Sequence, residues 1–261
     1  MQDIHALFDQ VLPIVRRAGA YVRTATPLTV NEKRNHTDLV TEYDVNTQRM
    51  LIEQLTILDP DAKFVGEEEH KTAETAVGDC FVIDPIDGTT NFVKGYGRSA
   101  VSVALLRDGK QAFGIVYNPY KDEIYTAIKG EGAFMNGKAI HVSEASLHDS
   151  VVNFGTAPYY PELTQRTFRI LDKVMKTAVD IRRFGSSALD LCDVACGRGG
   201  AFFELCLSPW DHAAGGLIVT EAGGVISDGN GNPLTFEGPG AVLAGGKTAW
   251  KELLDIITST K

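Results

Sequence analysis

The stretch FVIDPIDGTTNF, residues 81–92, runs strand-forming residues directly into two carboxylates spaced three positions apart. A carboxylate at the end of a buried strand is costly unless a cation or a hydrogen-bond donor pairs with it. The pattern predicts that Asp84 closes the strand and that Asp87 begins a turn into a helix at Gly88 and Thr89. The fold must therefore bring a cation or hydrogen-bond donors to this turn.

This turn offers two kinds of ligand. Both carboxylates, a backbone carbonyl such as that of Ile86, and water are the oxygen ligands that Mg²⁺ prefers. The first free N–H groups of the helix, at Gly88 and Thr89, favour an anion such as phosphate. The same residues also form a good turn and capping sequence, so the motif alone leaves a plain structural role open.

Two further segments carry acids in comparable positions. In FVGEEEH, Glu67 follows a strand and can point inward, whereas we expect Glu68 and Glu69 to stay in water as part of a solvated charge run. In SPWDHAAGG, Ser208 is the expected N-cap of a helix and Asp211 its third residue, which makes a capping box. The carboxylate of Asp211 could equally turn toward a cation.

Length and composition indicate a soluble globular protein. The 261 residues suggest one large domain, 1–261, or two halves that share an interface, and the change of pattern near residue 145 suggests the division into 1–145 and 146–261. Glu67, Asp84 and Asp87 lie in the first half and Asp211 in the second. The hydrophobic fraction of 44% and the charged fraction of 23% are ordinary. A net charge of −9 argues against a nucleic-acid surface, which needs a concentrated basic patch.

The chain shows no membrane or secretion signal. No window approaches 18 consecutive apolar residues, and the N-terminus reads as an amphipathic helix that carries acids. The cysteines form no C-x-x-C pair, and each sits in an apolar stretch, which favours small core residues in a reducing cytosol. They are Cys80, Cys192, Cys196 and Cys206.

Periodicity predicts alternating helices and strands. Helices are expected at about 3–24, 43–58 and 161–176, in SSALDLCDVACG and SPWDHAAGGLIVTEAGG, and at the C-terminus to Ile257. KFVG and CFVID read as strands, and residues 100–128 as an antiparallel meander, followed by a hairpin with a type I′ turn at Asn136 and Gly137. Strands follow in SVVNFG, AVDIRRFG and GAFFEL and around Val225 and Val242.

Taken together, these segments resemble the inositol monophosphatase family of metal-dependent phosphatases. VIDPIDGTTNF and WDHAAGGLIVTEAGG match its two signature segments, VGEE and FFEL support them, and the similarity runs from about Leu39 to Gly246. The resemblance implies an α/β (α+β) fold, a layered α-β-α-β-α sandwich with mixed sheets.

The resemblance also implies a metal site. Glu67, Asp84 and the carbonyl of Ile86 would hold one Mg²⁺, and Asp84, Asp87 and Asp211 a second, with a third ion near Glu67 in some relatives. Such a pair of ions fits the two-metal scheme for displacement at phosphorus.

Catalytic roles follow from the same resemblance. Thr89 and Glu67 would orient the attacking water, with Asp44 hydrogen-bonded to the threonine, although Asp44 can also be an ordinary residue of a first helical turn. NEKRNHTDLVTEYD resembles a mobile segment that closes over the metals, in which Lys33 would meet phosphate, and a solvated loop is the alternative.

Specificity is expected from the second half of the chain. Glu204 matches a family carboxylate that accepts hydrogen bonds from a sugar-like hydroxyl. Gly185, Ser186 and Ser187 could line the same pocket through backbone groups, although GSSALD also serves as an N-cap sequence. Thr156 is a weaker candidate. Arg182 and Arg183 could face phosphate, an interface or solvent. The substrate contacts implied are Lys33, Asp87, Gly88, Thr89, Gly185, Ser187 and Glu204.

The implied activity is that of a Mg²⁺-dependent phosphomonoesterase acting on inositol 1-phosphate or a related polyol phosphate. Fructose-1,6-bisphosphatase, histidinol phosphatase, NADP phosphatase and nucleotide 3′-phosphatase are alternatives within the superfamily, and DGTTNF leans toward the inositol type. A non-catalytic binding protein, for example of a transcription or translation complex, would have lost a ligand acid, whereas all four are present. The family further implies a homodimer and inhibition by Li⁺.

Overall fold

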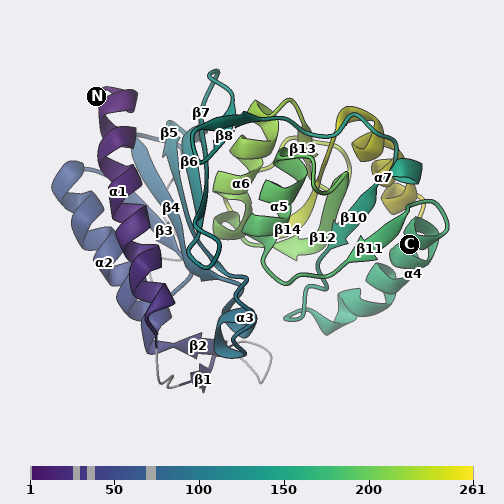
Figure 1. Cartoon of the computed structure of the whole chain (residues 1–261), viewed down its shortest axis with the longest axis horizontal. Coiled ribbons are helices and arrows are strands. Elements are labelled where there is room, and N and C mark those ends of the chain that lie inside the picture. The colour runs from purple at the N-terminus through teal and green to yellow at the C-terminus, as the bar shows by residue number, and fades with distance from the viewer. Residues whose placement is uncertain (1, 26–29, 34–38, 69–74, 261) are drawn as a thin grey trace.

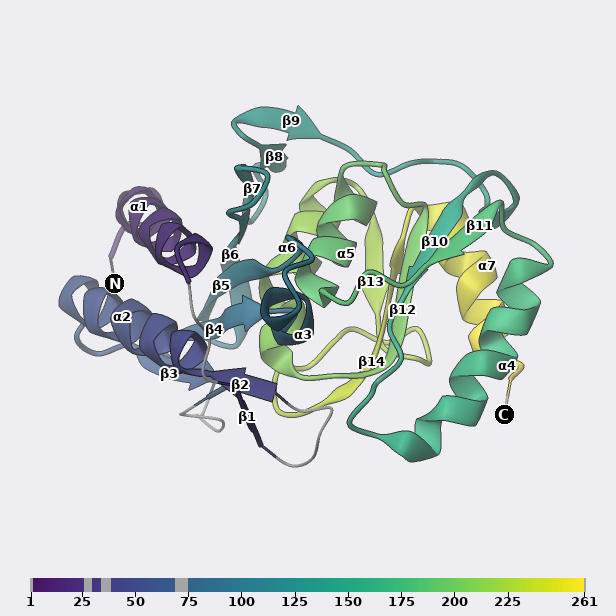
Figure 2. The same cartoon turned by 60° about the horizontal axis from the view of Figure 1, so that its bottom comes forward.

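The structure is a computed structural model that describes residues 2–25, 30–33, 39–68 and 75–260. Helices and sheets alternate in five layers, as the views in Figures 1 and 2 show. In order, the layers are α1 (Ile4–Arg23) with α2 (Glu42–Leu58), a seven-stranded sheet, α5 (Ser187–Ala195) with α6 (Pro209–Glu221), a five-stranded sheet, and α4 (Thr164–Met175) with α7 (Lys247–Thr258). The layered α-β-α-β-α sandwich expected from the sequence is therefore confirmed.

The first sheet is built from consecutive segments of the chain. Its order is β3 (Lys63–Gly66), β4 (Asp79–Asp87), β5 (Ala100–Arg107), β6 (Lys110–Asn118), β7 (Glu123–Ile128), β8 (Ala133–Met135) and β9 (Lys138–Ile140). β3 and β4 are parallel and the other neighbours antiparallel, which confirms the predicted meander. Asn136 and Gly137 both have positive φ, 50° and 75°, as a type I′ turn requires.

α1 and α2 cover the outer face of this sheet. The buried side chains of α1 recur at helical spacing, and Pro13 is accommodated inside the helix. Asp3 caps α1 by accepting a hydrogen bond from the Ala6 amide at 2.9 Å. Beneath them lies an apolar core that includes Leu7, Leu51 and Phe81.

β4 does not end where the sequence suggested. The strand was expected to close at Asp84, but it continues to Asp87, and its register against β5 shifts between these two residues. Pro85 lies within this shift, which suits a residue that cannot donate to the ladder. The following helix, α3 (Thr89–Val93), has only five residues.

The second sheet carries the opposite face of the site. Its order is β11 (Asp180–Arg182), β10 (Val151–Phe154), β12 (Ala201–Leu207), β14 (Gly240–Gly245) and β13 (Val225–Ser227). β10 is parallel to both of its neighbours, whereas β14 is antiparallel to β12 and β13. The predicted division near residue 145 falls between β9 and β10, and the assignment of a single domain stays a prediction.

α5 and α6 lie between the two sheets and are buried on nearly all sides. α6 approaches β6 so closely that a Cβ on Gly114 would lie only 2.7 Å from the Ala214 carbonyl oxygen. α5 and α6 meet in the same way at Gly215, where a Cβ would lie 2.9 Å from Leu191. This packing holds α6 against the first sheet and α5 against α6.

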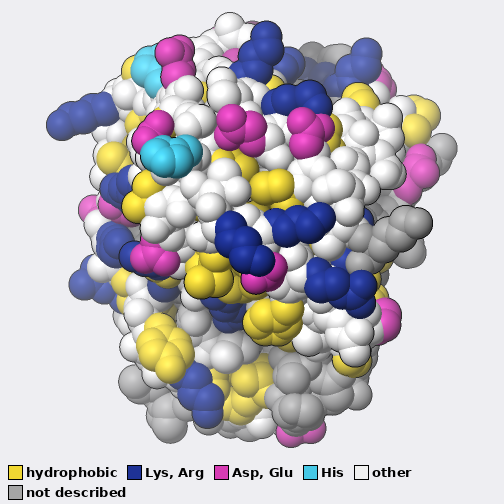
Figure 3. All heavy atoms as spheres, turned by 90° about the vertical axis from the view of Figure 1, so that its right-hand side faces the viewer, with side chains coloured by type: hydrophobic (Ala, Val, Ile, Leu, Met, Phe, Trp, Pro, Cys, Tyr) yellow, Lys and Arg dark blue, Asp and Glu magenta, His cyan; other side chains and the backbone are white. Residues whose placement is uncertain are grey.

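The outermost layer shows apolar side chains among basic ones (Figure 3). Phe168 and Met175 on α4 and Val179 after it are 58%, 63% and 65% exposed. α4 was expected to start at Pro161, but residues 161–163 form a short 3₁₀ turn before it. No helix of the described residues is long and apolar enough to cross a membrane.

Candidate active site

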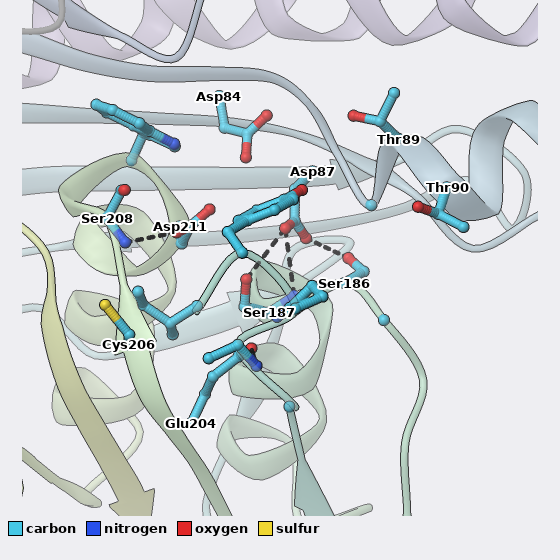
Figure 4. A pocket seen from close by; sticks show the side chains of 18 of the residues that line it. Asp84, Asp87, Thr89, Thr90, Ser186, Ser187, Glu204, Cys206, Ser208 and Asp211 are labelled. Atoms are coloured by element: carbon cyan, nitrogen blue, oxygen red, sulfur yellow. Dashed lines mark hydrogen bonds between the residues drawn. The ribbon is translucent and has the colours of Figure 1, made fainter. Parts of the chain in front are cut away.

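Three acids converge where β4 ends and α6 begins. Asp84 and Asp87 come from β4 and Asp211 from the first turn of α6, and their ligand oxygens lie within 4.8 Å of one another. Glu67, just after the parallel strand β3, lines the same pocket of about 130 Å³. Figure 4 shows the three aspartates side by side, with Glu204 across the pocket from Asp84.

Asp87 is held by the start of α5, about 100 residues away in the sequence. Its carboxylate accepts hydrogen bonds from the Ser186 hydroxyl, the Ser187 amide and hydroxyl at 3.2 and 3.1 Å, and the Ala188 amide at 3.0 Å. The sequence GSSALD also suits a plain N-cap, but the Ser186 side chain makes no cap hydrogen bond. The serines of this turn therefore orient a carboxylate at the site.

The other two aspartates are oriented by their own turns. Asp84 accepts a hydrogen bond from the Ile86 amide at 3.0 Å. Asp211 accepts one from the Ser208 amide at 2.6 Å, which is the capping interaction predicted for the start of α6. Each carboxylate keeps an oxygen that these bonds do not use.

The three aspartates are strongly disfavoured as free anions. Burial, together with Glu67 and the neighbouring aspartates, raises the pKa of Asp84 and of Asp211 well above the usual range. Burial also raises the pKa of Asp87, to about 6, although its serine partners oppose the rise. A divalent cation would relieve this repulsion, and an all-oxygen donor set suits a hard ion such as Mg²⁺. The residues present therefore fit the metal that the sequence predicted.

Lys33 reaches the edge of the acidic cluster. Its Nζ lies 3.0 Å from Glu67 Oε1 and 2.5 Å from Glu68 Oε1. The Glu68 side chain is only 6% exposed, so the expectation of a solvated Glu68 is wrong, because Lys33 provides it with a buried partner. Burial raises the pKa of Glu68 to about 7. Glu69 and residues 34–38 of the segment expected to be mobile lie outside the described residues.

Thr89 connects α2 to the turn after β4. Its hydroxyl lies 3.2 Å from both Asp44 Oδ1 and the Ile86 carbonyl oxygen. Asp44 also accepts hydrogen bonds from the amide and hydroxyl of Thr41, at 2.8 and 2.6 Å, and so caps α2 as well. Burial raises the pKa of Asp44 to about 6. Both interpretations of Asp44 from the sequence, a residue of the first helical turn and a partner of the threonine, fit this geometry, and the capping interaction is an addition from the structure.

Two glycines let the halves of the pocket meet. Gly88 and Gly185 have φ of 87° and 82°, a conformation that other residues rarely adopt. A Cβ on Gly88 would lie 2.8 Å from the Gly185 carbonyl oxygen. The turn of residues 87–89 and the loop before α5 are therefore in backbone contact, and both glycines line the pocket.

Glu204 forms the far wall of the pocket. It lies in the middle of β12, is 8% exposed, and accepts a hydrogen bond from the Ala157 amide at 2.7 Å. Burial raises its pKa to about 7. Gly155 leaves room for this carboxylate, because a Cβ there would lie 1.8 Å from Glu204 Oε2. Thr156, the weaker candidate, is not among the described residues that line the pocket.

Several lining residues carried no signal in the sequence. The loop after β10 contributes Tyr159 and Tyr160, β12 contributes Cys206, and α5 contributes Asp190. None of them was assigned to the site from the sequence, although Cys206 directly follows the FFEL segment. Arg183, which the sequence left open, also lines the pocket.

Comparison with known proteins gives consistent matches along the chain. The model of the inositol monophosphatase family matches residues 5–260. Inositol monophosphatase 2 of Solanum lycopersicum is 40% identical over 233 residues, which cover 86% of this chain and 88% of the relative.

Two further matches are similar in extent. The Nus factor SuhB of Pasteurella multocida is 37% identical over 221 residues, covering 84% of this chain and 82% of that protein. The solved structure of the Thermotoga maritima IMPase superposes with a TM-score of 0.87 at 31% identity, and the match covers 96% of each chain.

Proposed function

Because this chain belongs to the inositol monophosphatase family, we propose that it is a Mg²⁺-dependent phosphomonoesterase that hydrolyses inositol 1-phosphate or a related polyol phosphate. The observation that carries this proposal is the convergence of Asp84, Asp87 and Asp211 within 4.8 Å, beside Glu67. Buried acids at such short range are tolerated when they hold cations.

The proposed ligands divide between two ions. Glu67, Asp84 and the Ile86 carbonyl would hold one, and Asp84, Asp87 and Asp211 the other, with a third ion near Glu67 as in some relatives. When bound, Mg²⁺ supplies positive charge for the phosphate oxygens and lowers the pKa of water.

The protein's own groups would position the reactants. Thr89, fixed by Asp44, and Glu67 would orient the attacking water, and the Glu67 carboxylate would accept its proton. The backbone at Gly88 and Thr89 would donate to the phosphate, and Glu204 would accept a hydrogen bond from a hydroxyl of the leaving group. Gly185 and Ser187 would bound the same pocket, and Lys33 would approach the phosphate once Glu67 binds metal.

Phosphate release from inositol 1-phosphate tests this proposal. Purified protein should release phosphate with Mg²⁺, lose the activity on chelation, and regain it when Mg²⁺ is restored. Hydrolysis that chelation does not affect, or none with Mg²⁺ supplied, would count against an enzyme of this type. A panel including fructose 1,6-bisphosphate, histidinol phosphate, NADP and a nucleotide 3′-phosphate would identify the preferred ester.

A second candidate function is a regulatory binding role. The similarity to proteins named Nus factor SuhB favours it as an addition to catalysis. Asp84→Asn separates the two roles, because it should abolish hydrolysis while leaving a binding surface intact.

Sedimentation and a lithium titration would test two expectations carried over from the family, a homodimer and inhibition by Li⁺. The free cysteines Cys80, Cys192, Cys196 and Cys206 support our proposal of a reducing, cytoplasmic location.

A further inference from the structure

Arg183 lies in the wall of the active-site pocket. It follows the edge strand β11 and packs over Gly185, where a Cβ would lie 2.5 Å from its Nη1. No carboxylate of a described residue lies within 4.0 Å of its guanidinium. The neighbouring Arg182, in contrast, pairs with Asp180 and lines a different hollow.

The pocket at the acids is too small to enclose a whole substrate. Its volume is about 130 Å³, whereas pockets that enclose small ligands hold roughly 300–1,000 Å³. A second hollow of about 490 Å³ adjoins it. The two share Thr90, Pro158 and Arg183 in their walls, so a leaving group that outgrows the first pocket extends past Arg183.

The second hollow differs from the first in charge. Among the described residues that line it, the charged ones are both cations, Arg183 and Lys94, and the others include the apolar Val30, Leu39 and Val93. The first pocket, in contrast, is lined by six carboxylates, those of Glu67, Asp84, Asp87, Asp190, Glu204 and Asp211. In a chain with a net charge of −9, a hollow whose described lining lacks acids suits an anion.

We propose that Arg183 is a specificity-determining residue that binds a second anionic group of the substrate. The substrate class is then a phosphate ester whose leaving group carries hydroxyls and a further phosphate or carboxylate. Glu204 would accept from a hydroxyl, and the planar guanidinium would donate two parallel hydrogen bonds to the anion. This inference rests on the proposed phosphatase function and deepens it.

A matched pair of substrates tests the inference. Fructose 1-phosphate and fructose 1,6-bisphosphate differ only in the second phosphate. The wild-type protein should show the higher kcat/KM for release of the 1-phosphate from the bisphosphate, and raised ionic strength should narrow the difference. In Arg183→Ala, the loss of kcat/KM for the bisphosphate should exceed the loss for the monophosphate by about tenfold, mainly through KM.

Two control variants separate position from charge. Arg182→Ala removes a neighbouring guanidinium that pairs with Asp180, and it should leave the preference unchanged. Arg183→Lys keeps the charge but cannot donate two parallel hydrogen bonds, and it should retain part of the preference for the bisphosphate. Equal losses for both substrates in Arg183→Ala, or the same loss of preference in Arg182→Ala, would overturn the assignment.

A binding measurement distinguishes failure of this inference from failure of the proposed function. If the wild-type protein hydrolyses none of the esters, including inositol 1-phosphate, the proposed function has failed. Fructose 6-phosphate can then be titrated against the metal-free protein by NMR, since the unneutralised acids repel phosphate from the first pocket. Chemical-shift changes that Arg183→Ala abolishes and Arg182→Ala retains support the inference. A wild-type protein that does not bind the sugar phosphate contradicts it.

Discussion

Asp84 lies buried at the centre of the acidic cluster. Replacing one of its carboxylate oxygens by an amide nitrogen tests its role as a metal ligand. Asp84→Asn should lower phosphate release by a hundredfold or more, because the amide cannot supply the charge that two proposed ions share. The fold should remain, since removing one buried charge lessens repulsion with Glu67, Asp87 and Asp211. Steady-state kinetics together with thermal unfolding of the metal-free protein measure both effects.

Asp255→Asn is the matched control for this variant. Asp255 lies on α7, is exposed, and pairs with Lys251 one turn away. The exchange should leave activity unchanged and alter stability by less than about 0.5 kcal/mol. An active Asp84→Asn protein would remove Asp84 from the proposed ligands.

Gly155 controls the position of Glu204. Gly155→Ala should displace the Glu204 carboxylate from the Ala157 amide, because the new methyl group occupies the place of Oε2. The backbone at Gly155 does not need positive φ, so the change should cost the fold little. We expect KM for inositol 1-phosphate to rise about tenfold, as when a hydrogen bond to a charged group is lost.

Gly238→Ala is a fitting control for the glycine exchange. A Cβ at Gly238 would meet no atom within 4 Å, and this residue also lacks positive φ. Its kinetics should match the wild type. A Gly155→Ala protein with unchanged KM would show that Glu204 does not contact the substrate.

At the scale of a helix, Asp211 has two functions that can be separated. Asp211→Asn keeps an oxygen that can accept from the Ser208 amide, whereas Asp211→Ala loses both this cap and the proposed ligand. Both variants should be inactive, but the Ala variant should be less stable than the Asn variant by about 1 kcal/mol, the usual value of an N-cap. Urea unfolding of the two proteins without metal measures the difference. Equal stabilities would show that the cap does not stabilise α6.

Elements with a strong local signal were predictable from the sequence. α2, the meander of β5 to β7 and the turn at Asn136 and Gly137 follow from periodicity and turn chemistry. The start of α4 was misplaced, because Pro161 also suits a 3₁₀ turn. β4 extends past Asp84 because β5 still pairs with Asp87 after the register shift, a contact that no local pattern announces.

The site shows the same division between local and distant contacts. Asp84, Asp87 and Asp211 stood out in the sequence because each follows or opens a recognisable element. The residues that bind these aspartates were harder to predict, since the hydrogen-bond partners of Asp87 come from the start of α5, about 100 residues away. The run of glutamates predicted a solvated Glu68, whereas the fold places Lys33 beside it and buries its side chain.

For the whole molecule, the cluster predicts how stability depends on pH. Asp44, Asp84, Asp87 and Asp211 all have raised pKa values in the fold, so the folded state holds protons that the unfolded chain releases above about pH 4. Without metal, the free energy of unfolding should therefore fall as pH rises from about 4 to 7. Glu68 and Glu204, whose pKa values burial raises to about 7, act in the same direction. His212, whose pKa burial lowers to about 4, acts in the opposite direction.

Mg²⁺ should reverse this trend. Ions favour the ionised carboxylates, so the stabilisation by Mg²⁺ should grow with pH and reach about 2.7 kcal/mol at a hundredfold excess over Kd. Urea unfolding at pH 5 and pH 7.5, with chelator and with Mg²⁺, measures both slopes. Stability that rises with pH in the presence of chelator would contradict the predicted repulsion among the acids.

The position of a bound ion tests the account most directly. Crystals grown without metal and soaked in Mn²⁺, a stand-in for Mg²⁺ with an anomalous signal, would locate the ions independently of activity. We predict anomalous peaks between the carboxylates of Asp84, Asp87 and Asp211, with Glu67 beside them, and none there in Asp84→Asn crystals treated in the same way. Wild-type crystals without a peak among these carboxylates, or with Mn²⁺ bound only elsewhere, would contradict it.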